Sequence, residues 1–325
     1  MKTLKWGILG PGRIAEKVAE AILQSENGEL YAIGSRSLDK AADFAKRFGA
    51  SKSYDSYEEL CADDKLDIIY IATPHSFHCE HSMIAMKHGK HVLCEKPFAL
   101  DADEASQMMN CAKKNNVFLM EAMWSRFLPG MKKVKELLAS NAIGTIKTFT
   151  ANFCFSSSPE QKPRLFEPSL GGGALLDVGI YPVTLACSFF GFPLKSSARA
   201  DLTDKGVDAT SYYNLEFVNG VKAEMFSSIV QEGDSKAVIT GEEGQIIIHA
   251  NCWTLQSITL KNGKETSFHT PYEGSDYRLQ IEEVNQCIEH GLKESSVNSF
   301  QWTQGMMQVM DDLREKMGVD YKTKM

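Results

Sequence analysis

Short hydrophobic runs alternate with amphipathic segments over the first 124 residues of the chain. The amphipathic segments begin near residues 13, 37, 77 and 101. This alternation predicts repeated strand–helix–strand units, and therefore a parallel sheet that helices cover on both faces. The runs expected to form strands are LKWGIL, ELYAIGS, LDIIYIAT, HVLCEK and VFLMEA.

The pattern changes in the second part of the chain. From Gly144 onward, apolar residues alternate along longer segments such as TIKTFTANFCFS and VKAEMFSSIV, as they do in strands with one buried face. Asn219-Gly220 and Asn262-Gly263 are typical of hairpin turns. We therefore expect an open, mostly antiparallel sheet in this part. The helices expected with it span about 129–140, 276–290 and 300–317.

Composition narrows the class of protein. With 325 residues, of which 43% are hydrophobic and 24% charged, the chain is long enough for two domains with separate cores. The formal net charge of -7 argues against nucleic acid as a partner, because nucleic-acid-binding proteins gather Lys and Arg on one face. The longest nearly apolar run, LDIIYIAT, is too short for a membrane span, which needs about 18 apolar residues.

Two features favour a cytoplasmic protein. The N-terminal apolar run is interrupted at once by Gly, Pro and Arg, so we expect no secretory signal peptide. The cysteines are scattered along the chain without a C-x-x-C pair, which fits reduced thiols that pack as small apolar residues.

A glycine-rich motif follows the first predicted strand. Gly10-Pro11-Gly12-Arg13-Ile14-Ala15 matches the G-x-G-x-x-G/A fingerprint of dinucleotide-binding proteins, at a point where a strand gives way to a helix. Gly10 permits the tight turn, and Gly12 lets a pyrophosphate approach the backbone at the positive end of the helix dipole. A plain tight turn is the alternative interpretation. The expected cofactor contacts in this loop are Gly10, Gly12, Arg13 and Ile14.

These patterns divide the chain into two expected domains. Residues 1–122 are expected to form a Rossmann domain, with a doubly wound parallel sheet that binds the dinucleotide. Residues 123–325 are expected to form an α+β domain for substrate binding and oligomerisation, without a flexible linker before it. The long strands of this domain should expose one sheet face, with Phe217, Val221 and Met225 on it. We therefore expect a homodimer or larger homo-oligomer joined through that sheet.

The residues after the second strand indicate which dinucleotide binds. A carboxylate there would bind a free ribose 2′-hydroxyl, whereas a cation would accommodate a 2′-phosphate. The strand ends in Ser35, Arg36 and Ser37, and the first acid, Asp39, lies inside the next predicted helix. Two hydroxyls and a guanidinium suit a phosphate, so NADP is favoured over NAD. In the alternative interpretation Ser37 only caps the helix and Arg36 is solvated.

Three further segments carry a family resemblance. CEKPFAL follows the fifth strand, and its Lys96-Pro97 bond is of the kind that can be cis. ATPHSFH follows the fourth strand, and GGGALLDVGIYPVTLA occupies residues 171–186. Together with the fingerprint, these segments resemble the Gfo/Idh/MocA oxidoreductase family over essentially the whole chain. The chain is most similar to the branch that contains dimeric dihydrodiol dehydrogenase and NADP-dependent D-xylose dehydrogenase.

The resemblance implies a catalytic set of Lys96, Asp177 and Tyr181. Many family members have D-x-x-x-H where this chain has Asp177-Val178-Gly179-Ile180-Tyr181, and residues four apart share a helix face. The family pattern implies that Tyr181 exchanges the hydroxyl proton of the substrate, that Lys96 assists, and that Asp177 orients the substrate or the lysine. A tyrosine has an ordinary pKa of about 10, which a nearby ammonium lowers toward the working pH. Alternatively, Tyr181 is a core aromatic, Asp177 a helix cap and Lys96 a surface charge.

The same resemblance implies further contacts. Trp124, Arg126 and Phe127 are expected to line the substrate pocket, although packing between domains explains the two aromatic residues about as well. The roles of Arg164 and Phe166 stay open. The cofactor contacts implied in the two remaining loops are Thr73, Pro74, His78, Glu95, Lys96 and Pro97.

A metal site is not expected. His75, His78 and His81 are spaced so that they drift around a helix, and no distant Cys/His pair completes a zinc set.

The expected function is NADP-dependent oxidation or reduction of a CH–OH group. The resemblance implies that a hydride moves between the nicotinamide and a carbinol carbon of a sugar, polyol or cyclic trans-diol. Two alternatives stay open: a sensor that binds NADP(H) without turnover, and the NAD-dependent glycoside hydrolysis of the same family.

Overall fold

The computed structural model describes residues 3–321, which fold into two compact units. The first unit contains the chain up to Phe127 and the segment Glu273–Gln304. The second unit contains Leu128–Tyr272 and the chain from Gly305 onward. These ranges differ from the expected domains, residues 1–122 and 123–325, mainly because a late segment returns to the first unit. The helical period of that segment does not indicate which sheet it covers.

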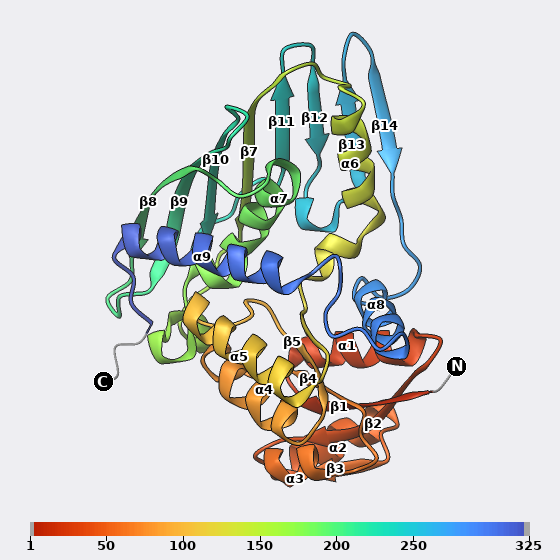
Figure 1. The fold of residues 1–325 in the computed structure, drawn as a ribbon. Coiled ribbons are helices and arrows are strands. Elements are labelled where there is room, and N and C mark those ends of the chain that lie inside the picture. Colours follow the sequence, from red (N-terminus) through yellow and green to blue (C-terminus); the bar gives the residue numbers. More distant parts are fainter. Residues whose placement is uncertain (1–2, 322–325) are drawn as a thin grey trace. The chain divides into compact units, whose positions relative to one another are not determined.

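The first unit is a doubly wound sheet of parallel strands in the order β3-β2-β1-β4-β5-β6 (Figure 1). This is the strand order of dinucleotide-binding Rossmann domains, so the expected fold is confirmed. Helices α3, α4 and α5 pack as one layer, while α1 packs against α8. The strands are β1 (Leu4–Leu9), β2 (Gly28–Gly34), β3 (Lys52–Tyr54), β4 (Ile68–Ile71), β5 (His91–Cys94) and β6 (Leu119–Glu121). The helices are α1 (Arg13–Gln24), α2 (Leu38–Phe48), α3 (Tyr57–Ala62), α4 (His78–Lys87), α5 (Ala102–Asn115) and α8 (Arg278–Glu289).

Specific hydrogen bonds hold the returning segment to this unit. Trp6 is fully buried in β1, and its Nε1–H donates to Asn285 Oδ1 of α8 at 3.2 Å. Asn298 Nδ2 donates to Glu121 O at the end of β6 at 3.0 Å. The segment therefore completes the core of the first unit.

The second unit is built on an eight-stranded sheet in the order β14-β13-β12-β11-β7-β10-β9-β8. All neighbouring strands are antiparallel except β7 and β10, which confirms the expected mostly antiparallel sheet. The hairpin turns expected at Asn219-Gly220 and Asn262-Gly263 join β9 to β10 and β13 to β14. The strands are β7 (Ile146–Cys154), β8 (Lys195–Leu202), β9 (Asp208–Glu216), β10 (Lys222–Ser228), β11 (Ala237–Gly241), β12 (Gln245–Ile248), β13 (Ser257–Lys261) and β14 (Glu265–His269). The helices are α6 (Pro129–Ala139) and α7 (Ile180–Phe190), and α9 (Phe300–Met317) runs from the first unit into the second.

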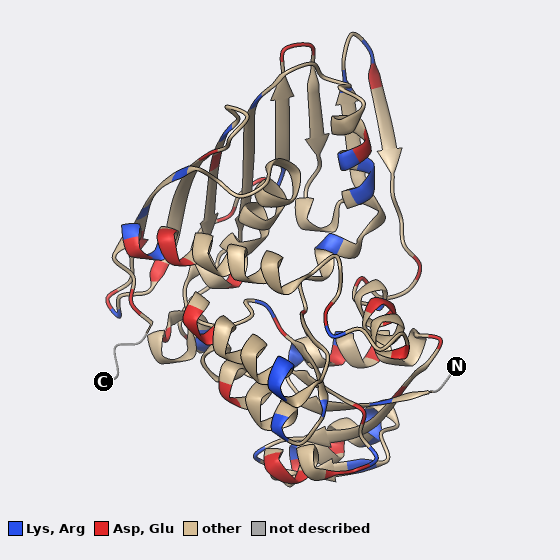
Figure 2. Cartoon of the chain, in the orientation of Figure 1, with Lys and Arg blue, Asp and Glu red and all other residues tan. Residues whose placement is uncertain are grey.

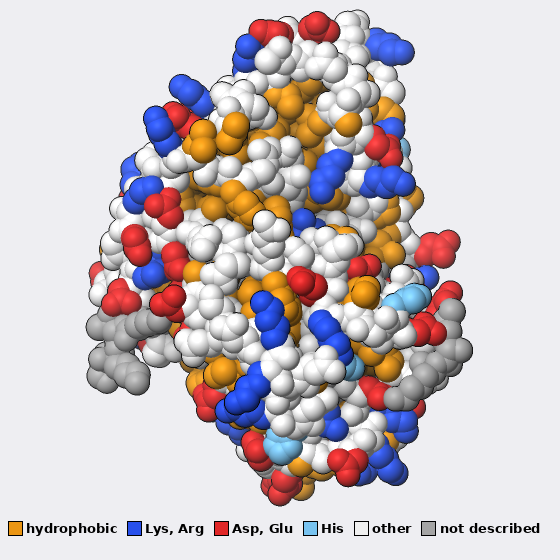
Figure 3. Space-filling view, viewed as in Figure 1, with side chains coloured by type: hydrophobic (Ala, Val, Ile, Leu, Met, Phe, Trp, Pro, Cys, Tyr) orange, Lys and Arg blue, Asp and Glu red, His pale blue; other side chains and the backbone are white. Residues whose placement is uncertain are grey.

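Helix α7 is the central core element of the second unit. It packs against β7 and β10, and Figure 2 shows that it carries no charged residue. The stretch Pro168–Phe190 is long and apolar enough to resemble a membrane span. However, 78% of its most apolar 18-residue part is buried, as in the core helix of a globular protein. Hydrophobic side chains gather over this part of the unit in Figure 3. Phe189 and Phe190 of α7 are partly buried.

The residues expected on the exposed face of this sheet lie on the opposite face. Phe217, Val221 and Met225 are 2%, 1% and 4% exposed, so the expectation that they form an outer apolar face was wrong. Phe217 packs against Phe190 of α7, with ring centroids 5.4 Å apart. The alternating residues Glu224 and Phe226 of β10 face outward instead. Alternation identified two faces, but it did not indicate which one the helices cover.

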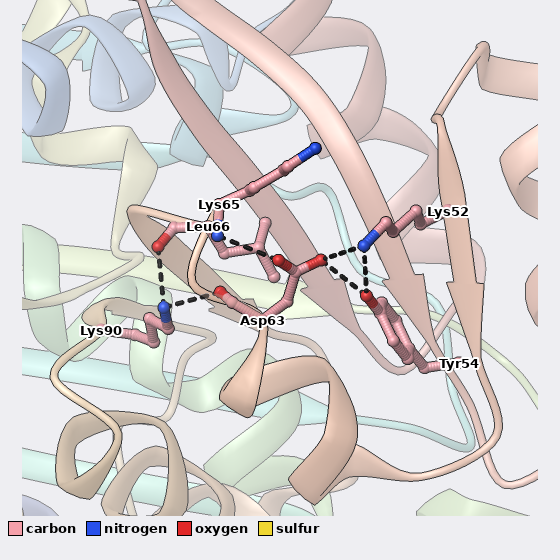
Figure 4. Close-up of polar contacts among 6 residues, drawn as sticks. All are labelled: Lys52, Tyr54, Asp63, Lys65, Leu66 and Lys90. Atoms are coloured by element: carbon pink, nitrogen blue, oxygen red, sulfur yellow. Dashed lines mark hydrogen bonds and ion pairs between the residues drawn. The ribbon is translucent and has the colours of Figure 1, made fainter.

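Strand β3 and helix α3 were not predicted from the sequence, and a polar cluster around Asp63 holds them (Figure 4). Asp63 Oδ2 accepts the Tyr54 hydroxyl at 2.6 Å and Lys52 Nζ at 2.9 Å. Burial raises the pKa of Asp63, but hydrogen bonds from Tyr54, Lys65 N–H and Lys52 outweigh it and lower the pKa to about 2. Lys90 Nζ donates to Asp63 O at 2.7 Å. The polar contacts around Asp63 therefore stabilise β3 and α3, whose sequence has only a short apolar pattern.

Candidate active site

The glycine-rich loop between β1 and α1 has the geometry that a pyrophosphate requires. Gly10 adopts a left-handed φ of +96°, and a Cβ on it would lie 3.1 Å from Ala72 O. Gly12 is exposed at the N-cap of α1, and a Cβ there would meet no atom within 4 Å among the described residues. The loop therefore fits a dinucleotide, with space for phosphates at the first N–H groups of α1. Arg13 is exposed and Ile14 half-buried in the first turn of this helix.

The end of β2 presents a guanidinium and two hydroxyl groups. Arg36 is exposed, and the buried Ser35 accepts the N–H of Ser37 with its Oγ at 3.3 Å. Ser37 stands at the N-cap of α2 without a side-chain capping bond in the described chain, so capping does not explain its hydroxyl. Burial raises the pKa of Tyr57, while the charge and hydrogen bond of Arg36 oppose this shift. Tyr57 is thus a neighbour of Arg36, and the first acid, Asp39, lies in the helix as expected.

Three histidines lie in or beside the loop that follows β4 at Thr73. His78 is fully buried, with Nδ1 2.8 Å from Pro97 O and Nε2 2.8 Å from Thr73 O. His81 Nδ1 lies 3.1 Å from Thr73 Oγ1, and burial lowers the pKa of His81. His75 is buried, with its ring centroid 5.6 Å from that of His78. His78 therefore joins two loops through their backbones, and among residues 3–321 no group of three His, Cys, Asp or Glu side chains is arranged to hold a metal ion.

Lys96 stands in the turn after β5. The Lys96–Pro97 peptide bond is cis. The N–H of Lys96 donates to Glu95 Oε2 at 3.2 Å, and the buried Tyr70 hydroxyl donates to the other oxygen of Glu95. The side chain of Lys96 is half-buried. The hydrogen bonds of Glu95 thus fix the backbone from which the ammonium group extends.

A second buried carboxylate, Glu121, lies against the same turn. Its Oε1 accepts the N–H of Phe98 at 3.1 Å, and Thr303 Oγ1 donates to Oε2 at 3.3 Å. Burial raises the pKa of Glu121 to about 7, against these two hydrogen bonds. The charge of Arg126 also lowers this pKa, and the charge of Glu95 raises it. A group that titrates near neutrality therefore supports the turn.

The residues expected to contact the cofactor share one position in the fold. All follow the carboxyl ends of β1, β2, β4 and β5, which form the edge of a parallel sheet where ligands bind. These residues are Gly10, Gly12, Arg13, Ile14, Ser35, Arg36, Ser37, Thr73, Pro74, His78, Glu95, Lys96 and Pro97.

The three residues expected to line the substrate pocket have different surroundings. Trp124 is buried, with its ring centroid 5.0 Å from that of Tyr277. The guanidinium of Arg126 lies 3.6 Å from the centroid of the Trp302 ring. Phe127 is half-buried. Within the first unit, the late segment 273–304 therefore supplies packing partners for both Trp124 and Arg126.

In the second unit, the glycine-rich segment opens a helix through a π-helical turn. This turn, η5 (Leu175–Gly179), precedes α7, and the N–H of Ile180 reaches Leu175 O, five residues back. Single π-turns are frequent at functional sites. Asp177 and Tyr181 lie four residues apart across the junction, about one helical turn, and so share one side of the helix.

Asp177 forms an ion pair with Arg164. Arg164, in η3 (Pro163–Phe166), places Nη2 2.7 Å from Asp177 Oδ1. The two side chains are 37% and 16% exposed, so this pair has polar groups that a ligand can reach. Phe166, whose role was also open, is buried in a core cluster with Val178 and Ile229. The structure therefore associates Arg164 with the site and Phe166 with the core beneath it.

Tyr181 lies beside a pair of stacked aromatic rings. Phe153 of β7 and Trp253 of η6 (Cys252–Thr254) stack with centroids 3.4 Å apart and planes within 5°. The Tyr181 centroid is 5.4 Å from that of Phe153 and 6.3 Å from that of Trp253. Both rings are partly exposed, so a flat apolar surface adjoins the expected proton donor.

Gly179 brings this helix close to the sheet. A Cβ on Gly179 would lie 2.9 Å from Ser227 Oγ and still closer to the Tyr213 hydroxyl. Tyr213 and Ser227 are buried and hydrogen-bonded to each other. Because Gly179 has no side chain, the helical segment can approach the sheet closely. This close approach determines how far Asp177 and Tyr181 lie from the sheet.

Sequence reasoning missed several residues of this site. Phe153 and Trp253 are distant in the chain, and neither lies in a motif. Tyr57 follows Ser56, whose capping of α3 was the only available signal. Glu121 stands at the end of a predicted strand, and a buried acid has no sequence signature of its own.

Two family profiles match the chain. Residues 4–123 match the oxidoreductase family with an NAD-binding Rossmann fold, GFO_IDH_MocA. Residues 131–247 match the GFO/IDH/MocA C-terminal domain.

Named relatives match over nearly the whole chain. The sequence is 36% identical over 329 residues to trans-1,2-dihydrobenzene-1,2-diol dehydrogenase of Xenopus laevis, covering 98% of this chain and 99% of the relative. It is 33% identical over 325 residues to scyllo-inositol 2-dehydrogenase (NADP(+)) IolU of Bacillus subtilis (strain 168), covering 98% of each. The crystal structure of KijD10, a 3-ketoreductase from Actinomadura kijaniata in complex with NADP and TDP-benzene, superimposes with a TM-score of 0.89 at 25% identity, covering 97% of this chain and 98% of that one.

The raised pKa of Glu121 predicts a pH-dependent stability. The folded protein holds this proton up to a pKa of about 7, whereas the ordinary value is 4.5, so the stabilisation is complete below 4.5 and is lost as pH rises to 7. Glu121→Gln should remove about 3 kcal/mol of this pH dependence in the free energy of unfolding. Urea unfolding at pH 4.5 and pH 8 measures the difference. The exposed variant Glu136→Gln is the control, and an equal pH dependence in Glu121→Gln and wild type would contradict the assignment.

Proposed function

Because this chain belongs to the Gfo/Idh/MocA family of oxidoreductases, we propose that it transfers a hydride between NADP(H) and a carbinol carbon of a sugar, polyol or cyclic trans-diol. The observation that carries the proposal is the helix side that presents Asp177 and Tyr181, with Arg164 on the carboxylate and stacked rings beside the phenol. The polar groups suit hydroxyl substituents, and the stacked rings suit the flat side of a ring.

The chain's own residues manage the cofactor and the proton. The N–H groups at the start of α1 would hold the pyrophosphate, and Arg36 would accommodate the 2′-phosphate. A nicotinamide held there would supply the hydride acceptor in the oxidative direction. Tyr181 as a phenolate accepts the hydroxyl proton as the carbonyl forms, the Lys96 ammonium stabilises that phenolate, and Asp177 orients a neighbouring hydroxyl. In reduction the same groups return the proton.

Specificity for NADP rests on Arg36. Arg36→Ala should weaken NADP binding by about 1–3 kcal/mol, the scale of a hydrogen bond to a charged group, and change NAD binding little. Titration of the protein with each cofactor, followed by fluorescence or calorimetry, measures both affinities. Lys40→Ala, which removes an exposed charge from α2, is the control. Equal affinity of the wild type for NADP and NAD would contradict the proposal.

Proton transfer is tested with Tyr181→Phe and Lys96→Met. A panel of aldoses, polyols and trans-dihydrodiols with NADP identifies the best substrate by the absorbance of NADPH. On that substrate Tyr181→Phe should lower kcat by about 10²- to 10⁴-fold, with NADP affinity nearly unchanged because the ring is retained. If Lys96 and Tyr181 share one proton path, the double variant should lose less than the product of the two single losses.

Tyr31→Phe is the matched control, because Tyr31 is also a buried tyrosine and lies in the middle of β2, outside the proposed site. Tyr181 would be a packing residue if its variant kept more than half of wild-type kcat while hydride transfer limited the rate. Binding of NADPH without turnover on any substrate would favour a sensor. Tight, non-exchanging NAD with release of free sugar would favour glycoside hydrolysis.

The outer face of the second unit's sheet suits a second copy of this chain. Arg199 lies 3.7 Å over the Tyr212 ring, which stacks on Phe226 with centroids 6.1 Å apart. These residues line a concave region of about 450 Å³ together with charges of both signs, such as Glu224 and Lys236. Opposite charges on one face allow two identical faces to pair about a twofold axis. We therefore propose a homodimer joined through this face.

A charge placed on this face should prevent the association. Phe226→Asp should convert a dimer to a monomer at micromolar concentration, because it buries an unpaired carboxylate. Asn219→Asp, which adds the same charge at an exposed hairpin turn, should leave the dimer intact. Light scattering coupled to gel filtration measures the mass. A monomeric wild type would refute the proposal.

A further inference from the structure

A buried carboxylate lies directly beneath the glycine-rich segment of the second unit. Asp208 begins β9 and is fully buried. Its Oδ2 accepts the N–H of Leu175 at 2.6 Å and the hydroxyl of Ser211 at 2.6 Å. Its Oδ1 accepts the hydroxyl of Tyr321, near the C-terminus, at 3.4 Å. Two segments that lie far from β9 in the chain thus converge on one carboxylate.

The glycine-rich segment is shaped to this carboxylate. Gly173 adopts a φ of +112°, and a Cβ on it would lie 3.0 Å from Asp208 Cγ and still closer to Oδ1. A larger residue at Gly173 would displace either the segment or Asp208. The close approach allows the N–H of Leu175, two residues further on, to reach the carboxylate.

The charge of Asp208 is retained at a cost. Burial raises the pKa of Asp208 to about 6, while the hydrogen bonds from Ser211 and the Leu175 N–H oppose this shift. Tyr213 and Tyr321 are the titratable groups beside it, and each has its pKa raised by burial. A buried carboxylate is costly unless several donors satisfy it. Because Ser211, Tyr321 and the N–H of Leu175 all donate to it, Asp208 is ionised in the folded protein at neutral pH.

Leu175 is the first residue of the π-turn that leads into α7. Asp177 stands two residues after it, and Tyr181 lies one turn further along. No side-chain capping bond within the described residues holds the start of this turn, so the hydrogen bond from Leu175 to Asp208 is a fixed point for Asp177 and Tyr181.

We propose that Asp208 is a positioning residue for the reaction: by holding the N–H of Leu175 it sets the π-turn that presents Asp177 and Tyr181, and Tyr321 completes its hydrogen bonding from the C-terminal segment. The catalytic consequence rests on the proposed function of Tyr181. The proposed effect of Asp208 on the local opening of residues 172–181 does not depend on the function of Tyr181.

Two variants test this role. Asp208→Asn keeps the shape and one acceptor but loses the charge and the second acceptor. Tyr321→Phe removes only the hydroxyl. Thr210→Val is the matched control, because Thr210 lies in the same strand and its buried hydroxyl bonds to Ser228 at 2.8 Å, away from the π-turn.

Hydrogen exchange by mass spectrometry supplies a readout that does not depend on activity. Asp208→Asn should raise the exchange rate of peptides covering residues 172–181 about tenfold, which is the scale of a lost hydrogen bond to a charged group. The exchange rates of peptides from β10 to β12 should stay within twofold of wild type. Tyr321→Phe should speed exchange of the same peptides by a smaller factor of about three. Thr210→Val should leave the exchange of residues 172–181 unchanged.

Steady-state kinetics supply the second readout. With the best substrate, Asp208→Asn should lower kcat about tenfold or more while the Kd for NADP stays within twofold, because the cofactor residues lie in the other unit. Faster exchange in residues 172–181 with unchanged kcat would overturn the positioning role. Exchange that rises equally over the whole sheet, or not at all, would show that Asp208 is only a packing residue. If Asp208→Asn does not fold, Tyr321→Phe decides by the same measurements.

The two proposals fail separately. If the wild type turns over no substrate in the panel, the proposed function fails, and the exchange of residues 172–181 alone decides whether Asp208 holds the π-turn.

Discussion

Buried carboxylates that accept main-chain N–H groups hold the loops of both units. Glu121 accepts the N–H of Phe98 in the first unit, and Asp208 accepts the N–H of Leu175 in the second. A loop has no regular ladder of partners, so each interior N–H needs its own acceptor. A carboxylate is the strongest acceptor that a side chain offers, but its burial costs free energy. The raised pKa of Glu121, about 7, and of Asp208, about 6, records that cost.

Much of the fold follows from local patterns in the sequence. The alternation of short apolar runs with amphipathic segments correctly predicted the parallel sheet, because each strand–helix unit carries its own period. The fingerprint at Gly10 and Gly12 depends on neighbouring residues alone, and the structure shows the open loop that it predicts. The helix that carries Asp177 and Tyr181 was implied only by the family resemblance, and the π-turn was not expected, because a single widened turn leaves the apolar pattern almost unchanged.

The rest depends on contacts between distant segments. Strand β8 was missed because its sequence, KSSARADL, has few apolar residues, as is common at the edge of a sheet. Phe153 and Trp253 meet only when β7 and η6 are folded. The outward direction expected for Met225 was wrong, because a strand pattern separates two faces without indicating which one a helix will cover.

The parallel contact between β7 and β10 divides the second sheet into two antiparallel halves. Strands β11 to β14 are connected in series by short links, and so are β8 to β10, whereas β7 meets both β11 and β10 across long stretches of chain. The pairing of Thr148 with Lys222 cannot form by a hairpin, because α7, β8 and β9 lie between them in the chain. Closing that long loop is slow compared with forming either half. Since α7 packs on β7 and β10, the seam where the halves join is also the place where the helix with Tyr181 docks. Strand β7 therefore joins the two hairpin series through long-range contacts on both of its sides, and the helix with Asp177 and Tyr181 docks where these contacts meet.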